Sequence, residues 1–239
     1  MCNMRKTLLI KISGESFKQG DDLVSESRLN DLANQINTLS KTYNIGIVTG
    51  GGNLMRGGKN KSKLVKRFTA DQVGMLATVM NSLQLRDAIE AKGAKVTLYS
   101  LVTMPQFCKT YNVYNMRDDL SQGKVVIFAG GTGSPYFTTD SGIALRALES
   151  EAHYILMGKN GVDGVYTADP KVDKKAKRLD KVSYYEAIDK KLNFMDLAAL
   201  AFLDGTDTNV LVFDVNEPNC FVKVINKKIP YTLVNTKGK

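Results

Sequence analysis

One short stretch of the chain, residues 45–58 with the sequence IGIVTGGGNLMRGG, constrains the fold more than any other. An apolar run typical of a buried strand ends there in Gly50, Gly51 and Gly52. Because glycine has no Cβ, the backbone can take positive φ and bring its N–H groups close to an anion. Arg56 follows and carries a planar set of donors suited to phosphate oxygens. The stretch predicts a phosphate-binding loop, with an ordinary strand-to-helix turn as the alternative.

A second apolar run, residues 7–12, ends in Ser13-Gly14 and carries Lys11 near its end. A lysine in a buried strand either extends to the edge of the sheet or points into a polar site at the carboxyl end of the strands, where open α/β folds bind ligands. Ser25 then predicts the N-cap of a helix. The order strand, helix, strand favours a parallel sheet with a helical crossover.

After a basic loop, Thr69 and Gln72 predict a capping box that opens a long helix ending near Gly93. Asp71 would fall in the first turn, where the helix dipole stabilises a carboxylate, so simple capping electrostatics is an alternative to a functional role. The apolar side chains of this helix are predicted to lie in the core: Met75, Leu76, Val79, Met80 and Leu83.

Residues 125–129 predict another buried strand that ends in glycine, after an irregular region around Pro105. The stretch that follows, AGGTGSPYFTTD at residues 129–140, has more hydroxyls than a turn needs. These hydroxyls can bond to phosphate or a base, and Asp140 can bind a metal or orient another charge. Alternatively, Thr139 or Asp140 only caps the next helix. Farther on, Val165-Tyr166 predicts a small hairpin and Asp196 begins an apolar helix.

The composition excludes several classes of site. His153 is the only histidine, so catalytic triads and histidine-based metal sites lack donors. Cys2, Cys108 and Cys220 have no C-x-x-C spacing, which argues against a disulfide framework and a zinc site. No apolar run approaches about 18 residues and no signal peptide is visible. We therefore expect a single domain over residues 1–239, soluble and cytoplasmic, with no membrane contact.

The net charge of +9 raises the alternative of a basic nucleic-acid-binding protein. The basic runs, near residues 59–67 and 171–178, contain few aromatic side chains on which bases could stack. A solvated surface is the simpler interpretation, and we expect no nucleic-acid partner. The same charge would attract small phosphorylated substrates.

The common nucleotide-binding motifs are absent. Gly58-Lys59 is followed by Asn60, which breaks the P-loop pattern, and residues 131–133 do not continue to the third glycine of a dinucleotide site. Two glycine loops after strands, a strand lysine and several carboxylates nevertheless fit phosphoryl transfer. That reaction mainly requires positioning and the neutralisation of charge on the moving phosphoryl group.

Six motifs together resemble the bacterial uridylate kinase family of the amino acid kinase superfamily, and they cover nearly the whole chain. They are Lys11 to Gly14, Gly50 to Asn53 with Arg56-Gly57, Ala70-Asp71 with residues 74–78, residues 131–133 with 137–140, Asp163 to Tyr166 with residues 168–170, and Met195-Asp196. The resemblance implies a three-layer αβα sandwich around a mainly parallel sheet. It also implies direct in-line transfer of the γ-phosphoryl group of ATP to UMP with Mg²⁺, giving ADP and UDP for pyrimidine nucleotide biosynthesis.

The resemblance further implies three sets of site residues. The catalytic set is Lys11, Asp140 and Asp196. The ATP set is Lys11, Ile12, Ser13, Gly14, Gly52, Arg56, Asn160, Tyr166 and Asp169. The UMP set is Gly51, Asp71, Thr132, Gly133, Ser134, Pro135, Tyr136, Phe137, Thr138 and Thr139, with Asp71 on the ribose hydroxyls. No residue is assigned as a dedicated metal ligand. Some relatives have a second lysine at the position of Gly158, where this chain has Lys159 one residue later.

As further expectations, the resemblance implies an allosteric enzyme that UTP inhibits by occupying the UMP pocket. It also implies a homohexamer built as a trimer of dimers, with the helix after Ser25 near a dimer contact. A superfamily kinase acting on a carboxylate or carbamate is the alternative enzyme. A basic nucleic-acid-binding protein is the alternative outside enzymes.

Overall fold

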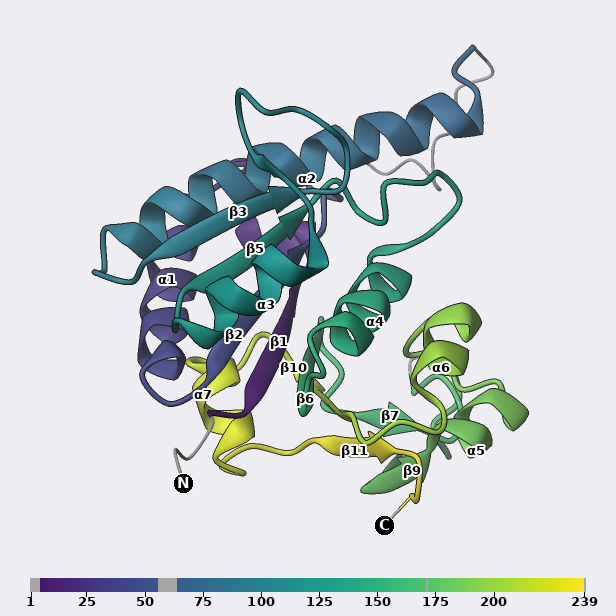
Figure 1. The fold of residues 1–239 in the computed structure, drawn as a ribbon. Coiled ribbons are helices and arrows are strands. Elements are labelled where there is room, and N and C mark those ends of the chain that lie inside the picture. Colours follow the sequence, from purple (N-terminus) through teal and green to yellow (C-terminus); the bar gives the residue numbers. More distant parts are fainter. Residues whose placement is uncertain (1–4, 56–63, 171, 239) are drawn as a thin grey trace.

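A central sheet organises the molecule, for which a computed structural model describes residues 5–55, 64–170 and 172–238 (Figure 1). Within those residues nine strands pair in the order β4-β3-β5-β2-β1-β6-β10-β11-β9. All neighbouring pairs are parallel except β10 and β11. The strands are β1 (Thr7–Ile12), β2 (Asn44–Thr49), β3 (Val96–Ser100), β4 (Lys109–Thr110), β5 (Val125–Ala129), β6 (Tyr154–Lys159), β9 (Lys181–Ser183), β10 (Asn209–Asp214) and β11 (Thr232–Asn235).

Helices cover both faces of this sheet. One face packs against α1 (Glu26–Ser40), α2 (Arg67–Glu90) and α7 (Cys220–Ile225). The other packs against α3 (Val113–Ser121), α4 (Thr139–Glu149), α5 (Tyr184–Asp189) and α6 (Leu197–Leu203). Since both faces are buried, the strands are continuous apolar runs rather than alternating ones. The predicted three-layer αβα sandwich with a mainly parallel sheet is confirmed.

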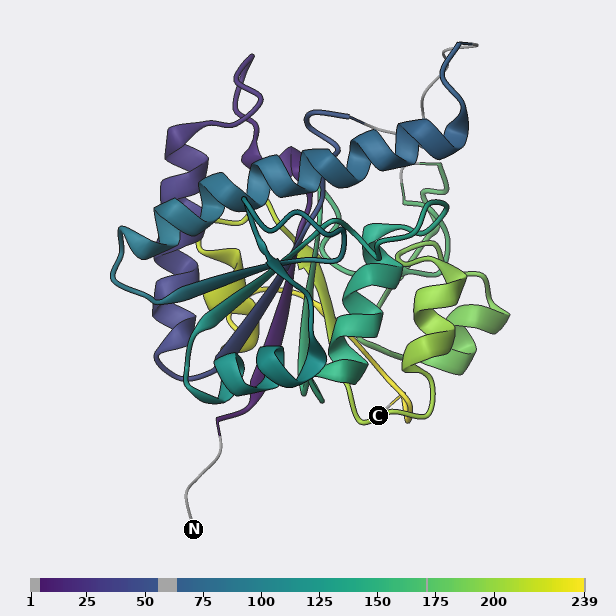
Figure 2. The same ribbon diagram turned by 45° about the horizontal axis from the view of Figure 1, so that its top comes forward.

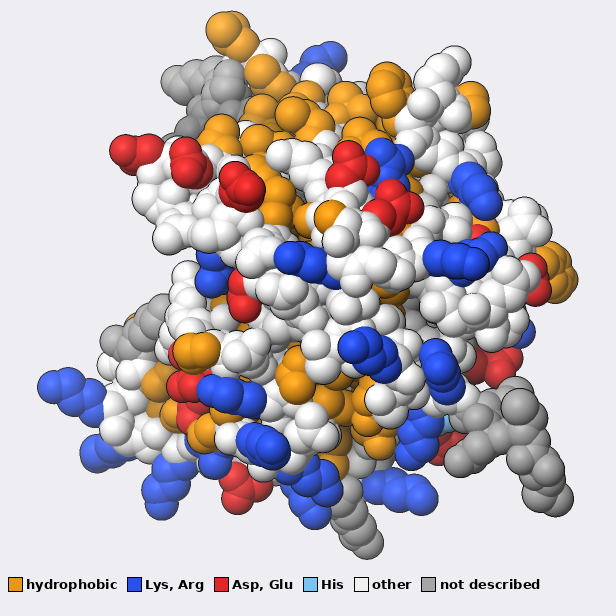
Figure 3. All heavy atoms as spheres, turned by 90° about the vertical axis from the view of Figure 1, so that its left-hand side faces the viewer, with side chains coloured by type: hydrophobic (Ala, Val, Ile, Leu, Met, Phe, Trp, Pro, Cys, Tyr) orange, Lys and Arg blue, Asp and Glu red, His pale blue; other side chains and the backbone are white. Residues whose placement is uncertain are grey.

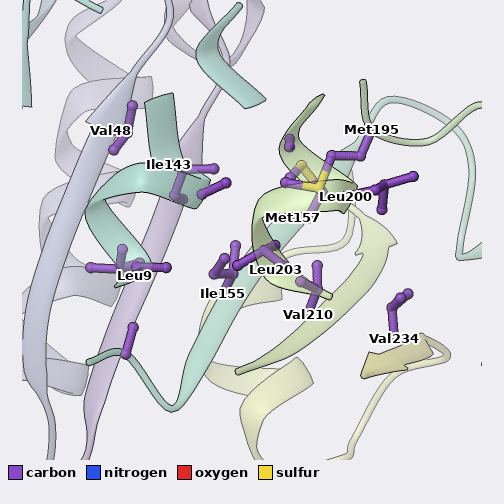
Figure 4. Close-up of a cluster of buried hydrophobic side chains, with 14 of the residues drawn as sticks. Leu9, Val48, Ile143, Ile155, Met157, Met195, Leu200, Leu203, Val210 and Val234 are labelled. Atoms are coloured by element: carbon purple, nitrogen blue, oxygen red, sulfur yellow. The ribbon is translucent and has the colours of Figure 1, made fainter. Parts of the chain in front are cut away.

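The alternation of side chains along β1 decides where its lysine points. Leu8 and Ile10 pack toward α1, whereas Leu9 packs on the opposite face. There Leu9 lies with Ile143 of α4 and Leu203 of α6 in one buried cluster (Figure 4). Lys11 is two residues beyond Leu9, so its side chain points to the α4 face at the end of the strand.

The helix predictions succeed for α1 and fail in part for α2. Ser25 is the N-cap position of α1, as predicted. Helix α2 begins earlier than predicted, after Lys66, so the capping box of Thr69 and Gln72 is wrong and Thr69 lies inside the helix. Asp71 accordingly lies one turn into α2, four residues after the first helical residue.

The core prediction for α2 is also partly wrong. Val79 is buried, but Leu76 and Met80 are 51% and 53% exposed. Figure 2 shows α2 running across the molecule, and apolar side chains gather at the top of the space-filling view in Figure 3. Leu76 and Met80 are exposed because α2 turns polar residues inward instead, among them Asn81 and Ser82, both with no exposed surface.

The region around Pro105 is more regular than predicted, since it contains β4 and α3. Asn112 caps α3 because its side-chain oxygen accepts hydrogen bonds from the N–H groups of Tyr114 and Asn115. The predicted hairpin is present as β7 (Val165–Tyr166), which pairs antiparallel with β8 (Arg178–Leu179). In the described ranges, no helix has the length and apolar character needed to span a membrane.

Candidate active site

The carboxyl ends of four strands form the site. Strands β5, β2, β1 and β6 are neighbours in that order and run parallel, so the segments that follow them meet at one end of the sheet. The segment after β2, residues 50–55, is here called the first glycine loop. The segment after β5, residues 130–138, is called the second glycine loop.

The first glycine loop packs tightly against its surroundings. A Cβ on Gly14, at the start of the 3₁₀ helix η1 (Gly14–Phe17), would lie 2.4 Å from the nitrogen of Gly52. A Cβ on Gly50 would lie 2.9 Å from the nitrogen of Gly14, and one on Gly51 would lie 2.7 Å from the carbonyl oxygen of Gly74 in α2. The prediction of positive φ here is wrong, since none of Gly50 to Gly52 has it. These glycines instead allow backbones to approach.

The second glycine loop uses left-handed backbone. Gly130, Gly131 and Gly133 have φ of 78°, 61° and 79°, the region that favours glycine. The loop ends at Thr138, whose hydroxyl accepts hydrogen bonds from the N–H groups of Asp140 and Ser141. Thr138 therefore caps α4, and the alternative in which Thr139 or Asp140 is the cap is wrong.

Lys11 and Asp140 form the central charge pair. The ammonium of Lys11 donates to Oδ1 of Asp140, and the two side chains are only 14% and 16% exposed. Asp140 lies in the first turn of α4, where the helix dipole stabilises a carboxylate. Of the two interpretations of Lys11, extension to a sheet edge is wrong, because β1 lies in the middle of the sheet.

Lys159, the last residue of β6 and the lysine nearest to position 158, lies close enough to Lys11 for their charges to interact. Burial and the charge of Lys11 lower the pKa of Lys159 to about 8, while the charge of Asp140 acts in the opposite direction. In the described part of the chain its ammonium has no hydrogen-bond or ion-pair partner. Gly158 could not carry a lysine without rearrangement, since a Cβ there would lie 2.9 Å from the Cβ of Val215.

Asp196 lies beside the beginning of α4, the helix that carries Asp140. Its carboxylate accepts hydrogen bonds from the hydroxyls of Thr138 and Ser141 and from the N–H of Ala199, 2.8 Å away. It therefore caps α6 and ties this helix to the beginning of α4. Its geometry is that of a group that positions Asp140 through α4.

A cavity of about 270 Å³ lies between the two glycine loops and α2. Much of the predicted UMP set lines it, namely Gly51, Asp71, Thr132, Ser134, Phe137, Thr138 and Thr139, together with Gly52. Gly133, Pro135 and Tyr136 belong to the same loop but do not line the cavity. The structure thus brings residues 51 and 71 to the second glycine loop across long sequence separations.

Asp71 connects α2 to the second glycine loop. Its carboxylate accepts from Nε of Arg67 at 2.8 Å and from the N–H of Tyr136 at 2.9 Å. Burial alone would raise the pKa of Asp71, but these two hydrogen bonds outweigh burial and hold the pKa below its ordinary value. Asp71 is therefore an ionised acceptor on the wall of the cavity at neutral pH.

A second cavity, of about 330 Å³, opens beyond β6. It brings together Asn160, Tyr166 and Asp169 of the predicted ATP set with Lys159. Residues 190–194, between α5 and α6, also line it, although no sequence motif marks them as site residues.

Four members of the predicted ATP set line neither cavity, namely Lys11, Ile12, Ser13 and Gly14, and a fifth cannot be assessed. Ile12 is fully buried and its carbonyl accepts from the N–H of Gly50 at 2.7 Å. The hydroxyl of Ser13 lies 3.0 Å from that of Ser16. Arg56 lies outside the described residues.

The fold and this site define a class of protein that comparison with known proteins identifies. Residues 6–214 match the model of the amino acid kinase family, and the chain belongs to that family. A uridylate kinase of Ureaplasma parvum is 41% identical over 97% of this chain and 100% of its own length. Within the family, the chain therefore groups with the uridylate kinases.

Solved structures agree with this assignment. The crystal structure of UMP kinase from Ureaplasma parvum matches with a TM-score of 0.92 at 40% identity, covering 97% of this chain and 99% of that one. The structure of UMP kinase from Bacillus anthracis matches with a TM-score of 0.90 at 33% identity, covering 98% and 97%.

Proposed function

We propose that this protein transfers the γ-phosphoryl group of ATP to UMP, producing ADP and UDP for pyrimidine nucleotide biosynthesis. One observation carries the proposal. The strand that bears Lys11 lies between β2, which leads to the 270 Å³ cavity, and β6, which leads to the 330 Å³ cavity. UMP in the first cavity and adenosine in the second would direct both phosphate chains toward Lys11. The relatives named above are uridylate kinases.

In this proposal Lys11 and Lys159 neutralise the charge of the transferred group, and the N–H groups of the first glycine loop bind ATP phosphates. Asp71 accepts hydrogen bonds from the ribose hydroxyls of UMP. Transfer is direct, because the candidate for a covalent intermediate is remote: His153 precedes β6, and its Nδ1 accepts from the N–H of Thr7 at the far end of β1.

Mg²⁺ fits this site only as a companion of ATP. In the ranges that the structure describes, no group of three or more His, Cys, Asp or Glu side chains could hold a metal by itself. Mg²⁺ commonly binds substrate phosphates with one or two carboxylates and water, and Asp140 supplies such a carboxylate. The ion would neutralise charge on the phosphates, while Lys11 and Asp140 hold the donor and acceptor in place.

A coupled assay of ADP release tests the activity. With ATP and Mg²⁺ we expect turnover with UMP, less with CMP, and background alone without an acceptor. A carboxylate and a carbamate acceptor belong in the same panel, because turnover with either in place of UMP would support a different branch of the family. DNA affinity that falls steeply with salt would support the nucleic-acid alternative.

UTP inhibition is a further part of the proposal, since the cavity that accepts uracil and ribose can also admit those groups of the end product. The expected pattern is competition with UMP. Inhibition that stays non-competitive toward UMP at every ATP concentration would instead require a separate site.

We also propose a homo-oligomer, most simply a hexamer of three dimers, in the cytoplasm where ATP and UMP are available. The exposed apolar side chains of α2, Phe68, Leu76 and Met80, support self-association, and α2 itself packs against α1. Light scattering that gives a mass near that of one 26.3 kDa chain would reject it.

A further inference from the structure

The inward side of α2 is polar, and its hydrogen bonds point at the two glycine loops. Thr78 and Asn81 are 6% and 0% exposed and lie one turn apart. Buried polar side chains inside a packed helix reduce stability unless each is hydrogen-bonded, so their partners reveal what they hold.

Asn81 holds the first glycine loop. Its amide nitrogen donates to the carbonyl oxygen of Gly50 and to Oδ1 of Asn53, both at 2.8 Å. The amide of Asn53 donates in return to Oδ1 of Asn81 at 3.1 Å and to the carbonyl of Leu23 at 2.8 Å. This reciprocal amide pair fixes the loop at both ends of its glycines. The same loop abuts Gly14, since a Cβ there would lie 2.7 Å from Oδ1 of Asn53.

Thr78 holds the second glycine loop. Its hydroxyl donates to the carbonyl of Met75 at 2.7 Å and accepts from the N–H of Gly130 at 2.8 Å. Gly130 is the first residue of that loop and has positive φ, so this hydrogen bond fixes the direction in which the loop leaves β5.

We propose that Asn81 and Thr78 are positioning residues, each mainly for one substrate, and that α2 sets the distance between the two substrate loops. This inference rests on the proposed function, because it assigns the loops to ATP and UMP. Asn81 acts mainly on ATP, through Gly52 and the contact of the first loop with Gly14, and to a smaller extent on UMP, because Gly51 of the same loop lines the 270 Å³ cavity. Thr78 acts on UMP through the second loop. Thr78 also lines the 270 Å³ cavity, but its hydroxyl is engaged by the carbonyl of Met75 and the N–H of Gly130, so both side chains work through the backbone.

The test compares Asn81→Leu, which keeps a similar volume, with Thr78→Val. We expect Asn81→Leu to raise KM for ATP about tenfold with a smaller change for UMP, and Thr78→Val to raise KM for UMP about tenfold with a smaller change for ATP. Thr78→Ser keeps the hydroxyl and should restore KM for UMP. Asn81→Ala provides a second variant if the leucine is not accommodated.

Ser82→Ala is the matched control. Ser82 is equally buried on the same helix, but its hydroxyl lies 2.7 Å from that of Thr49 in β2 and contacts neither loop. It should lower the melting temperature while leaving both KM values unchanged. A purely structural role for Asn81 and Thr78 predicts that same behaviour for them and would overturn the proposal.

Hydrogen exchange without substrates provides a readout that does not depend on the activity. Asn81→Leu should accelerate amide exchange in residues 50–55 and Thr78→Val in residues 130–138, each leaving the other loop unchanged. If the wild type lacks turnover with UMP but each variant accelerates exchange only in its own loop, the proposed function fails and the positioning roles stand. Equal acceleration of both loops in both variants would refute the positioning roles.

Discussion

The two glycine loops look alike in sequence and differ in what their glycines do. Both follow buried parallel strands, and both line the 270 Å³ cavity. In the first loop the glycines keep ordinary φ, and Gly50 and Gly51 leave no space for a Cβ against η1 and α2. In the second, Gly131 has φ of 61° while its Cβ direction is open, the nearest atom being 3.5 Å away.

This difference teaches that a glycine run predicts a loop without predicting why glycine is needed. The first loop is part of the packed interior, so a methyl group there meets other backbone. The second loop is fixed by its backbone conformation. A methyl group at Gly131 therefore strains mainly its own residue, whereas one at Gly130 or Gly133 would also crowd Leu101. The two loops should therefore respond differently to the same substitution.

The largest effect is expected from breaking the ion pair between Lys11 of β1 and Asp140 of α4. Lys11→Met keeps the length of the side chain but removes the donor to the transferred group, and we expect kcat to fall by about 10² to 10³ with little change in UMP affinity. Measurements of kcat, the UMP dissociation constant and the melting temperature check this. Lys6→Met, at the other end of the same strand region, is the control. A variant of Lys11 that keeps more than about half of its turnover would remove Lys11 from the catalytic residues.

Alanine at one glycine of each kind tests the comparison directly. Gly14→Ala places a Cβ 2.4 Å and 2.6 Å from two backbone nitrogens, which should lower the free energy of unfolding by about 3 kcal/mol and raise KM for ATP. Gly131→Ala should lower it by only about 1 to 2 kcal/mol, the strain of a left-handed alanine. Denaturant unfolding and substrate kinetics give both quantities.

Two controls separate packing from backbone strain. Gly20 has φ of 57° and open space around it on the surface. Gly20→Ala should therefore resemble Gly131→Ala in stability and leave the substrate kinetics unchanged. Gly131→Asn should be milder than alanine, because asparagine tolerates the left-handed region. Equal losses for Gly14→Ala and Gly131→Ala would contradict the distinction between the loops.

Much of the fold could be predicted because buried parallel strands are apolar runs. Strands β1 and β5 match the predicted residues, and the order of strands and crossover helices follows from the chain. Helix α2 was misjudged because its apolar residues were assigned to the core, whereas Asn81 and Ser82 occupy the inward side. A hydrophobic pattern cannot show that a helix turns polar groups toward neighbouring loops.

The site was predictable where single motifs carry it and less so where tertiary packing does. Lys11 and Asp140 were placed together by the resemblance, and the structure pairs them. The sequence identifies Lys159 only as the lysine nearest to position 158, and it contains no local signal for residues 190–194, because the relevance of both depends on which strand ends meet in space. Similarly, only the fold shows that Asp196 accepts hydrogen bonds from Thr138 and Ser141 at the beginning of α4.

Asp71 accepts a hydrogen bond from Tyr136 of the second glycine loop, and its proposed contact with UMP can be tested by changing the substrate. If its carboxylate accepts from the ribose of UMP, loss of that hydrogen bond should cost about 1.5 to 3 kcal/mol, so kcat/KM should be higher for UMP than for dUMP by about tenfold or more. Asp71→Asn should narrow that ratio, since a neutral amide is a weaker acceptor. Equal kcat/KM for UMP and dUMP in the wild type would remove Asp71 from the ribose site.

The smallest expected effect is the uptake of less than one proton per ATP bound, and it concerns Lys159 at the end of β6. Its pKa of about 8 in the free protein lies below the ordinary lysine value of 10.5. Between these values an unfolded chain holds the proton and the folded one releases it, so this group makes stability rise with pH across that window.

ATP phosphates beside Lys159 would favour the charged form, and binding should therefore take up protons between pH 8 and 10.5 while affinity falls with rising pH. Calorimetry of ATP binding in buffers with different ionisation enthalpies measures this uptake. Lys159→Arg, which stays charged, should bind ATP without it, and uptake that persists in that variant would assign the proton to another group.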